Sequence, residues 1–241
     1  MTQPLDLLAV FAHPDDAELL AGGALARSVD RGKRVGILDL TGGEMGSRGS
    51  AELRAREASA AAEVLGVSLR RNAGFPDAAI EATLANARRL AGLLRELRPT
   101  TVVTHWLEGR HPDHRHAARL VVESSYLAGL RRLEAPGEPF RPTKVVHATL
   151  FREDTPPSSF VVDVTDQTDR KLEALACYAS QFENVSGMGE VYPGGRRPLT
   201  DQVRVHLAYW GSRIRTEYGE PFWTREAVRA EGLTGLGVST Y

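Results

Sequence analysis

The chain has 241 residues, of which 42% are hydrophobic and 25% are charged. Its 30 Lys and Arg residues against 31 Asp and Glu residues leave a formal net charge of -1. Such a balanced charge does not favour a nucleic acid or an anionic membrane as a partner. The length suits one α/β domain that covers residues 1–241.

The cysteine content and the N-terminal segment bear on the compartment. Cys177 is the only cysteine of the sequence, so an internal disulfide is excluded. Residues 1–8 have neither a basic nor an apolar leader pattern. No uninterrupted apolar run approaches the roughly 18 to 20 residues of a membrane-spanning helix. We therefore expect a cytoplasmic protein without a transmembrane segment.

Strand and helix patterns alternate along the first part of the chain. Short apolar runs predict strands at residues 5–12, 34–40, 68–72 and 101–105. Helical spacing predicts a helix after each of them, at residues 17–30, 50–65, 83–97 and 112–127. Past residue 135 the pattern is weaker and indicates strands at 145–151 and 159–164, a helix at 167–181 and a Gly- and Pro-rich loop at 186–198.

This alternation predicts an α/β, Rossmann-like fold with a mostly parallel sheet, helices on both faces and an irregular C-terminal elaboration. Ligands of open parallel sheets bind beyond the carboxyl ends of the strands. Two polar clusters follow predicted strands there, His13-Pro14-Asp15-Asp16 after the first and Arg110-His111-Pro112-Asp113-His114 after the strand at 101–105. Both clusters should lie at one edge of the sheet.

Three of these side chains can hold a divalent ion. Catalytic zinc takes three protein ligands, typically imidazole nitrogens and carboxylate oxygens, and keeps one position open for water. His13, Asp16 and His114 supply such a set. We expect Zn²⁺, with Fe²⁺ or Mn²⁺ as alternatives.

The remaining members of the two clusters suit acid–base chemistry. Asp15 is placed to accept the proton of an attacking water. His111 could stabilise the negative oxygen of a tetrahedral intermediate or protonate the leaving amine. Asp113 would raise the pKa of His111 if the two side chains meet.

Each cluster by itself has a purely structural explanation. Paired Asp residues before a helix are commonly N-caps, and Asp15 and Asp16 could cap the helix from Ala17. A single His near a strand end is commonly a packing residue. Two such clusters, each after a strand and each before a helix, favour a metal site over packing.

The pair AHPDD and HPDH, about a hundred residues apart, resembles the PIG-L/LmbE-like deacetylases. That resemblance implies a Rossmann-like zinc enzyme that removes acetyl groups from N-acetylglucosaminyl conjugates. It implies His13, Asp16 and His114 as ligands, Asp15 as general base and His111 as the oxyanion or acid residue. Members of the family also form homo-oligomers, which implies that this chain could do so.

Within that family the chain resembles the bacillithiol branch, whose substrate is N-acetylglucosaminyl malate. The matching stretches are 39–44, 52–54, 75–77, 109–110, 178–182 and 218–222. The chain departs from the family pattern at one position. Relatives carry a tyrosine in the late loop, and an approximate alignment places Leu199 there. Tyr192 is the candidate replacement.

A malate-bearing sugar calls for arginine and hydroxyl-accepting groups near the metal. Arg54 and Arg110 are the candidate carboxylate-binding residues, and Asp77 could accept a sugar hydroxyl. A solvated helix face, with Glu52 or Glu57 as the partner, is the alternative for Arg54.

Two further acids near the predicted site have open roles. Glu18 could orient His13 through its free ring nitrogen, or could be an acid of the first helical turn. Glu44 could bind substrate or pair with Arg48.

Two other classes of function compete with the deacetylase. A nucleotide-binding protein does not fit, because the three-glycine spacing is missing and two Asp residues after the first strand would repel a pyrophosphate. A metal-binding protein without catalysis would need neither Asp15 nor His111. Deacetylation of a mycothiol-type inositol conjugate or of chitobiose-type sugars is the alternative within the enzyme hypothesis.

Overall fold

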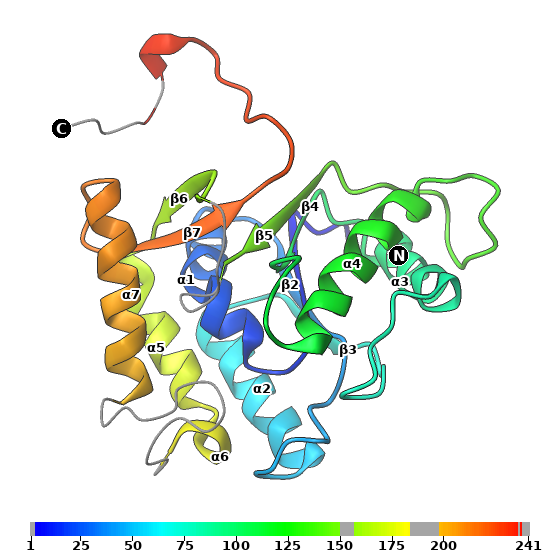
Figure 1. Cartoon of the computed structure of the whole chain (residues 1–241), viewed down its shortest axis with the longest axis horizontal. Helices are drawn as coiled ribbons and strands as arrows, with labels where there is room; N and C mark the ends of the chain where they lie inside the picture. Colours follow the sequence, from blue (N-terminus) through cyan, green and yellow to red (C-terminus); the bar gives the residue numbers. More distant parts are fainter. Residues whose placement is uncertain (1–2, 150–156, 184–197, 236, 238–241) are drawn as a thin grey trace.

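A computed structural model of the chain describes residues 3–149, 157–183, 198–235 and 237. Within these residues seven strands form one sheet in the order β3-β2-β1-β4-β5-β7-β6 (Figure 1). The strands are β1 (Leu7–Phe11), β2 (Val35–Asp39), β3 (Leu69–Asn72), β4 (Thr101–His105), β5 (Lys144–Ala148), β6 (Phe160–Asp163) and β7 (Gly219–Trp223). Strands β1 to β5 pair in parallel, and β7 runs antiparallel to both β5 and β6. The predicted mostly parallel α/β sheet is confirmed.

Helices lie on both sides of this sheet, with α3 and α4 on one side and α1, α2 and α5 on the other (Figure 1). The helices are α1 (Asp16–Asp30), α2 (Ala51–Leu65), α3 (Leu84–Leu97), α4 (Pro112–Ala128), α5 (Thr168–Ala176), α6 (Ala179–Phe182) and α7 (Leu199–Arg213), with short 3₁₀ turns at Thr165–Gln167 and Leu233–Gly235. Among the described helices, none has the length and apolarity that crossing a bilayer requires.

The central strand shows how the sequence builds two cores. Alternate residues of a strand point to opposite faces. Leu8 and Val10 of β1 enter the core under α3 and α4, whereas Ala9 and Phe11 enter the core with α1, α2 and α5. All four side chains are fully buried, which is why β1 reads as a continuous apolar run.

The strand order reverses between β1 and β4, since the chain proceeds from β1 to β2 and β3 on one side and then to β4 and β5 on the other. Ligand sites of doubly wound sheets lie at such a switch point, outside the carboxyl ends of the strands. Both His/Asp clusters follow these two strands, so the topology brings them together.

The C-terminal part differs from the sequence prediction. The helix expected at 167–181 is divided into a 3₁₀ turn, α5 and α6, because the fully buried Tyr178 leaves helical geometry between α5 and α6. The strand expected at 145–151 ends at Ala148, and its last residues lie outside the described part. The sequence patterns predicted neither α7 nor β7.

The sequence patterns did not predict strand β7, because its sequence, GEPFW, contains Gly and Pro, which are typical of a turn. Glu220 is 1% exposed, and its carboxylate accepts the N–H groups of Gly23 and Ala24 and the Lys171 ammonium at 2.6 Å. These contacts fasten β7 to α1 and α5. A buried charge becomes compatible with a strand only when such partners arrive from elsewhere in the chain.

Candidate metal centre and active site

The turn after β1 is closed by its own polar groups. The Asp16 Oδ2 atom accepts the His13 N–H at 2.8 Å, and the Asp16 N–H donates to the His13 carbonyl at 3.3 Å. Asp15 has a φ of 100° and its side chain makes no capping hydrogen bond. A positive φ costs most side chains roughly 1–2 kcal/mol, and Asp is among the residues that tolerate it. The capping explanation for the Asp15 side chain is therefore wrong.

The second cluster forms the start of α4. The His111 Nδ1 atom accepts the Asp113 N–H at 3.2 Å, and Pro112 occupies the first turn, where its missing N–H is not needed. His114 then follows on the first turn of α4. Its side chain contacts Asp16, in the turn after β1.

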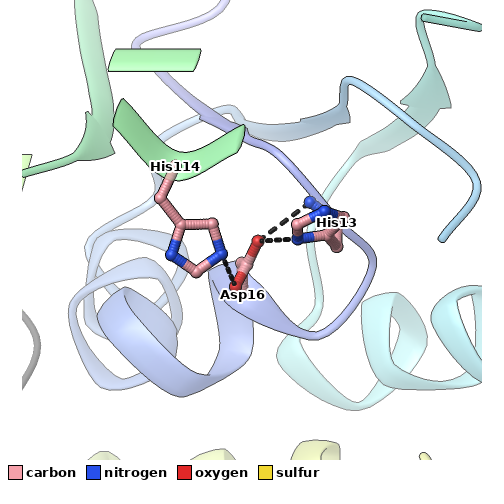
Figure 2. A group of neighbouring side chains, drawn as sticks. All are labelled: His13, Asp16 and His114. Atoms are coloured by element: carbon pink, nitrogen blue, oxygen red, sulfur yellow. Dashed lines mark hydrogen bonds and ion pairs between the residues drawn. The ribbon is translucent and has the colours of Figure 1, made fainter. Parts of the chain in front are cut away.

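His13, Asp16 and His114 come together as a group that could hold a metal ion. Figure 2 shows the Asp16 carboxylate between the two imidazoles. The His13 Nδ1 atom lies 3.2 Å from Asp16 Oδ2, and the His114 Nε2 atom lies 3.3 Å from Asp16 Oδ1. A second such group consists of His13, His111 and Asp113.

The other ring nitrogen of His13 faces two carboxylates. The Nε2 atom lies 3.1 Å from Asp77 Oδ1 and 3.4 Å from Asp113 Oδ2. Burial alone would lower the pKa of His13, but hydrogen bonds to Asp113, Asp16 and Asp77 raise it to about 12. Three carboxylates around one imidazole attract positive charge strongly, and a divalent ion supplies such charge.

Asp15 points to Arg54 on α2. The Arg54 Nη2 atom donates to Asp15 Oδ2 at 2.7 Å and to the Pro14 carbonyl at 2.8 Å, and Nη1 donates to the Gly43 carbonyl at 3.3 Å. Burial raises the pKa of Asp15 to about 7, although the Arg54 charge acts to lower it. A carboxylate that titrates near neutral pH suits a general base.

The Asp113 charge acts to raise the pKa of His111, as expected, but other groups outweigh it and the net pKa is lowered. The Asp113 carboxylate accepts the N–H groups of Ala78 and Ile80 and faces His13. Burial and the neighbouring His114 and His13 rings lower the pKa of His111. Since Nδ1 of His111 accepts a backbone N–H, its Nε2 atom carries the proton and can donate it.

The predicted substrate-binding residues have different surroundings. Arg54 is 6% exposed, so the solvated-face alternative is wrong; Glu57 binds Ser180 instead. Arg110 is exposed beside His111, and its carbonyl accepts from Arg115 at 2.8 Å. Asp77 lies within the site, against His13.

Neither of the two late-loop positions, Tyr192 and Leu199, contributes a side chain to the described part of the site. Tyr192 lies outside the described residues. Leu199 begins α7 and packs in a separate apolar cluster with α5.

Glu18 is an acid of the first turn of α1, which was one of its two expected roles, whereas Glu44 takes up a role that was not foreseen. Glu18 is fully buried, pairs with Arg70 and accepts the Tyr178 hydroxyl at 3.2 Å. Glu44 accepts the Asp77 N–H at 2.8 Å and the Gly42 N–H at 3.1 Å, so it braces the loops after β2 and β3.

Sequence reasoning missed His105, the last residue of β4. Its Nε2 atom accepts the Ala12 N–H at 2.9 Å, and its ring stacks on His114 at 3.9 Å between centroids. Burial lowers the pKa of His105 to about 3, so the ring is neutral. Its position at the carboxyl end of a central strand was the available signal.

Comparisons with known proteins show the family of the chain. A family model described as PIG-L: GlcNAc-PI de-N-acetylase matches residues 8–125. The diacetylchitobiose deacetylase of Thermococcus kodakarensis is 33% identical over 89% of this chain and 80% of that protein. The probable N-acetyl-alpha-D-glucosaminyl L-malate deacetylase 2 of Bacillus cereus is 31% identical over 73% of this chain and 84% of that protein.

A solved structure shows the same fold over nearly the whole length. The conserved protein TT1542 of Thermus thermophilus superposes with a TM-score of 0.85 at 38% identity, covering 95% of this chain and 98% of that one. Sequence relatives, fold and the paired His/Asp clusters agree, and the chain belongs to the PIG-L family of metal-dependent deacetylases.

Proposed function

We propose that this chain is a zinc-dependent deacetylase that hydrolyses the acetamide of an N-acetylglucosaminyl conjugate to a free amine and acetate. One observation carries the proposal: three side chains that could hold a metal ion converge beside Asp15, whose carboxylate has a pKa of about 7. Metal binding alone would not require a base in that position.

The donor set fits a divalent ion. Ligand atoms about 2.05 Å from a tetrahedral zinc lie about 3.3 Å apart. Asp16 has one oxygen near this spacing from each imidazole, Oδ2 at 3.2 Å from His13 Nδ1 and Oδ1 at 3.3 Å from His114 Nε2. Metal-binding histidines commonly donate their second ring N–H to a carboxylate, as His13 Nε2 does toward Asp77 and Asp113.

When bound, the ion supplies a Lewis acid that polarises the amide carbonyl and makes a water molecule more acidic. Asp15 accepts the proton of the attacking water. Arg54 holds the Asp15 carboxylate through a 2.7 Å charge-assisted hydrogen bond, which keeps it aimed and lowers its pKa.

His111 acts as the proton or hydrogen-bond donor, in contrast to Asp15, which accepts a proton. The Asp113 N–H fixes the imidazole through Nδ1, which leaves Nε2–H as the donor. That N–H can stabilise the developing oxyanion or pass a proton to the leaving amine. Asp113 orients His13 in this proposal, and Asp77 combines that role with acceptance of a sugar hydroxyl.

For the substrate we propose N-acetyl-alpha-D-glucosaminyl L-malate, with the inositol conjugate and chitobiose-type sugars as alternatives. The likeness to the Bacillus cereus protein and the exposed Arg110 beside the site support the malate conjugate. An amine-release assay of the zinc-loaded protein with these three substrates and free N-acetylglucosamine tests the choice. Amine release from none of them would leave a metal-binding protein without this activity.

Removing Arg54 should shift the pH dependence of catalysis. Asp15 must be unprotonated to act, so kcat/KM should rise with pH through the Asp15 pKa, at or below about 7 because a bound cation lowers it further. Arg54→Gln removes a charge that lowers this pKa, so the acidic limb should move up by about one pH unit or more. A pH–rate profile of both proteins measures the shift.

Arg71→Gln is the matched control, because Arg71 is a surface arginine paired with Glu96. Its profile should coincide with that of the wild type. An acidic limb that stays in place in Arg54→Gln would contradict the assigned Asp15–Arg54 coupling.

Arg110→Ala should discriminate between substrates. A charge-assisted contact to a carboxylate contributes roughly 1.5 to 3 kcal/mol, or about 10- to 150-fold in kcat/KM. The loss should fall on the malate conjugate and spare free N-acetylglucosamine, which has no carboxylate. Arg54→Ala, in contrast, should impair both substrates, because it also releases Asp15.

Steady-state kinetics on the two substrates measure this difference, with Arg204→Ala on α7 as the surface control. Equal losses for Arg110→Ala on both substrates would argue against a carboxylate contact. Activity confined to the inositol conjugate would assign the chain to the mycothiol type.

A further inference from the structure

We propose that His105 is a positioning residue of the metal centre, which holds the turn after β1 by a hydrogen bond and the ring of His114 by stacking. The proposal rests on the proposed function in one respect, since it takes Asp16 and His114 as metal ligands. His105 itself belongs to neither group of candidate ligands.

The backbone and ring of His105 are held firmly. The residue ends β4 and is 1% exposed. Its ring meets Phe11 edge to face at 4.7 Å, and its carbonyl oxygen is 2.7 Å from His147 Nδ1 of β5. The ring of His105 thus packs against β1, and its backbone is tied to β5.

The first function of this ring is to hold the segment that carries the ligands. Its Nε2 atom accepts the N–H of Ala12, the residue directly before His13, in a buried 2.9 Å hydrogen bond. Leaving such a buried N–H without an acceptor destabilises the folded turn. The bond therefore fixes where the chain leaves the sheet.

The same bond determines what Asp16 can bind. Asp16 Oδ2 lies 3.3 Å from His105 Nε2, but a nitrogen that accepts a hydrogen bond has no proton to donate to the carboxylate. The negative charge of Asp16 is thereby left for an ion between His13 and His114.

The second function concerns the orientation of His114. Its Nδ1 atom is buried and has no hydrogen-bond partner among the residues that the structure describes. A metal-binding imidazole is commonly oriented by a hydrogen bond from that second nitrogen. Here the ring lies nearly parallel to His105, at 11° and 3.9 Å, with His111 on its other side at 4.7 Å. Stacking on the anchored His105 ring takes the place of the missing hydrogen bond.

Two substitutions separate this role from simple core packing. His105→Phe keeps an aromatic ring for stacking but removes the acceptor for Ala12. His105→Gln removes the ring but offers an amide oxygen near the position of Nε2. His206→Phe on α7, a helix that packs on β6 and β7, controls for replacing a half-buried histidine away from the site.

The readouts are the Co²⁺ dissociation constant, from competition with a chromophoric chelator, and the visible absorption of the Co²⁺ protein. Loss of an outer contact of a metal site typically weakens binding about 10- to 100-fold. We expect a loss of this size with an altered spectrum for His105→Phe, a smaller loss for His105→Gln, and neither change for His206→Phe. Thermal melts of the metal-free proteins report folding.

Wild-type affinity and spectrum in His105→Phe would make His105 a packing residue and overturn the proposal. Should His105→Phe fail to fold, unchanged affinity and spectrum in His105→Gln would overturn it equally. A wild-type protein that binds no Co²⁺ would refute the metal centre itself, and that result is distinct from either outcome.

Discussion

Asp15→Asn is expected to lower kcat by on the order of 10²- to 10⁴-fold while the metal content stays unchanged, because an amide cannot accept the proton of the attacking water. Asparagine is the suitable replacement, since it has the same shape and tolerates the positive φ of this position. Its side chain can still accept from Arg54, so the loop should keep its conformation. Single-turnover kinetics with elemental analysis of the same sample measure both quantities.

Asp30→Asn is the matched control for this experiment. Asp30 ends the helix whose N-cap is Asp15, about 20 Å away at 1.5 Å per residue, and pairs with Arg170 at the surface. Its kcat should equal that of the wild type. Near wild-type turnover in fully metallated Asp15→Asn would remove Asp15 from the mechanism.

Replacing any one of His13, Asp16 or His114 with alanine is expected to weaken zinc binding by about 100-fold or more. Loss of an outer partner typically costs about 10- to 100-fold, and loss of a direct ligand should exceed that. The reason is geometric, because Asp16 stands 3.2 Å and 3.3 Å from the two imidazoles and joins them into one donor set. Chelator competition followed by elemental analysis gives the dissociation constants.

The alternative group of His13, His111 and Asp113 shares one residue with this set, so His13 alone does not distinguish the two. His114→Ala should lose the ion and His111→Ala should retain it. His116→Asn is the matched control on α4, since its amide can keep the contact with the Ile80 carbonyl. Retention of zinc in His114→Ala with loss in His111→Ala would move the ion to the second group.

Asp77 and Asp113 show how much residue type and local position predict about a side chain in the site. Both were predicted as site residues, and both lie in the site. Asp77 was expected to contact a sugar hydroxyl and Asp113 to act on His111, but both carboxylates face His13. Residue type and position after a strand predict which edge of the sheet a side chain occupies. They do not predict which side chain its oxygen atoms will contact. Here that side chain is His13, which lies about 64 residues before Asp77 and about 100 residues before Asp113 in the sequence.

Arg54 illustrates the same limit from the opposite direction. Its place on an amphipathic helix is compatible with a solvated face and with a buried one. Arg54 is buried because α2 packs near the Asp15 turn, 39 residues earlier in the chain. A guanidinium with carbonyl and carboxylate partners can be buried at acceptable cost, and those partners come from the tertiary fold.

The sequence by itself determined the alternating α/β order, the edge of the sheet that carries the chemistry and the residue types available there. These follow from local periodicity and from the position of His13 to Asp16 and His111 to His114 after strands. The tertiary structure alone decided the partners of those side chains, the place of β7 in the sheet and the part taken by His105, whose contact with Ala12 spans 93 residues. Contacts of that span depend on how elements pack, and no local pattern encodes them.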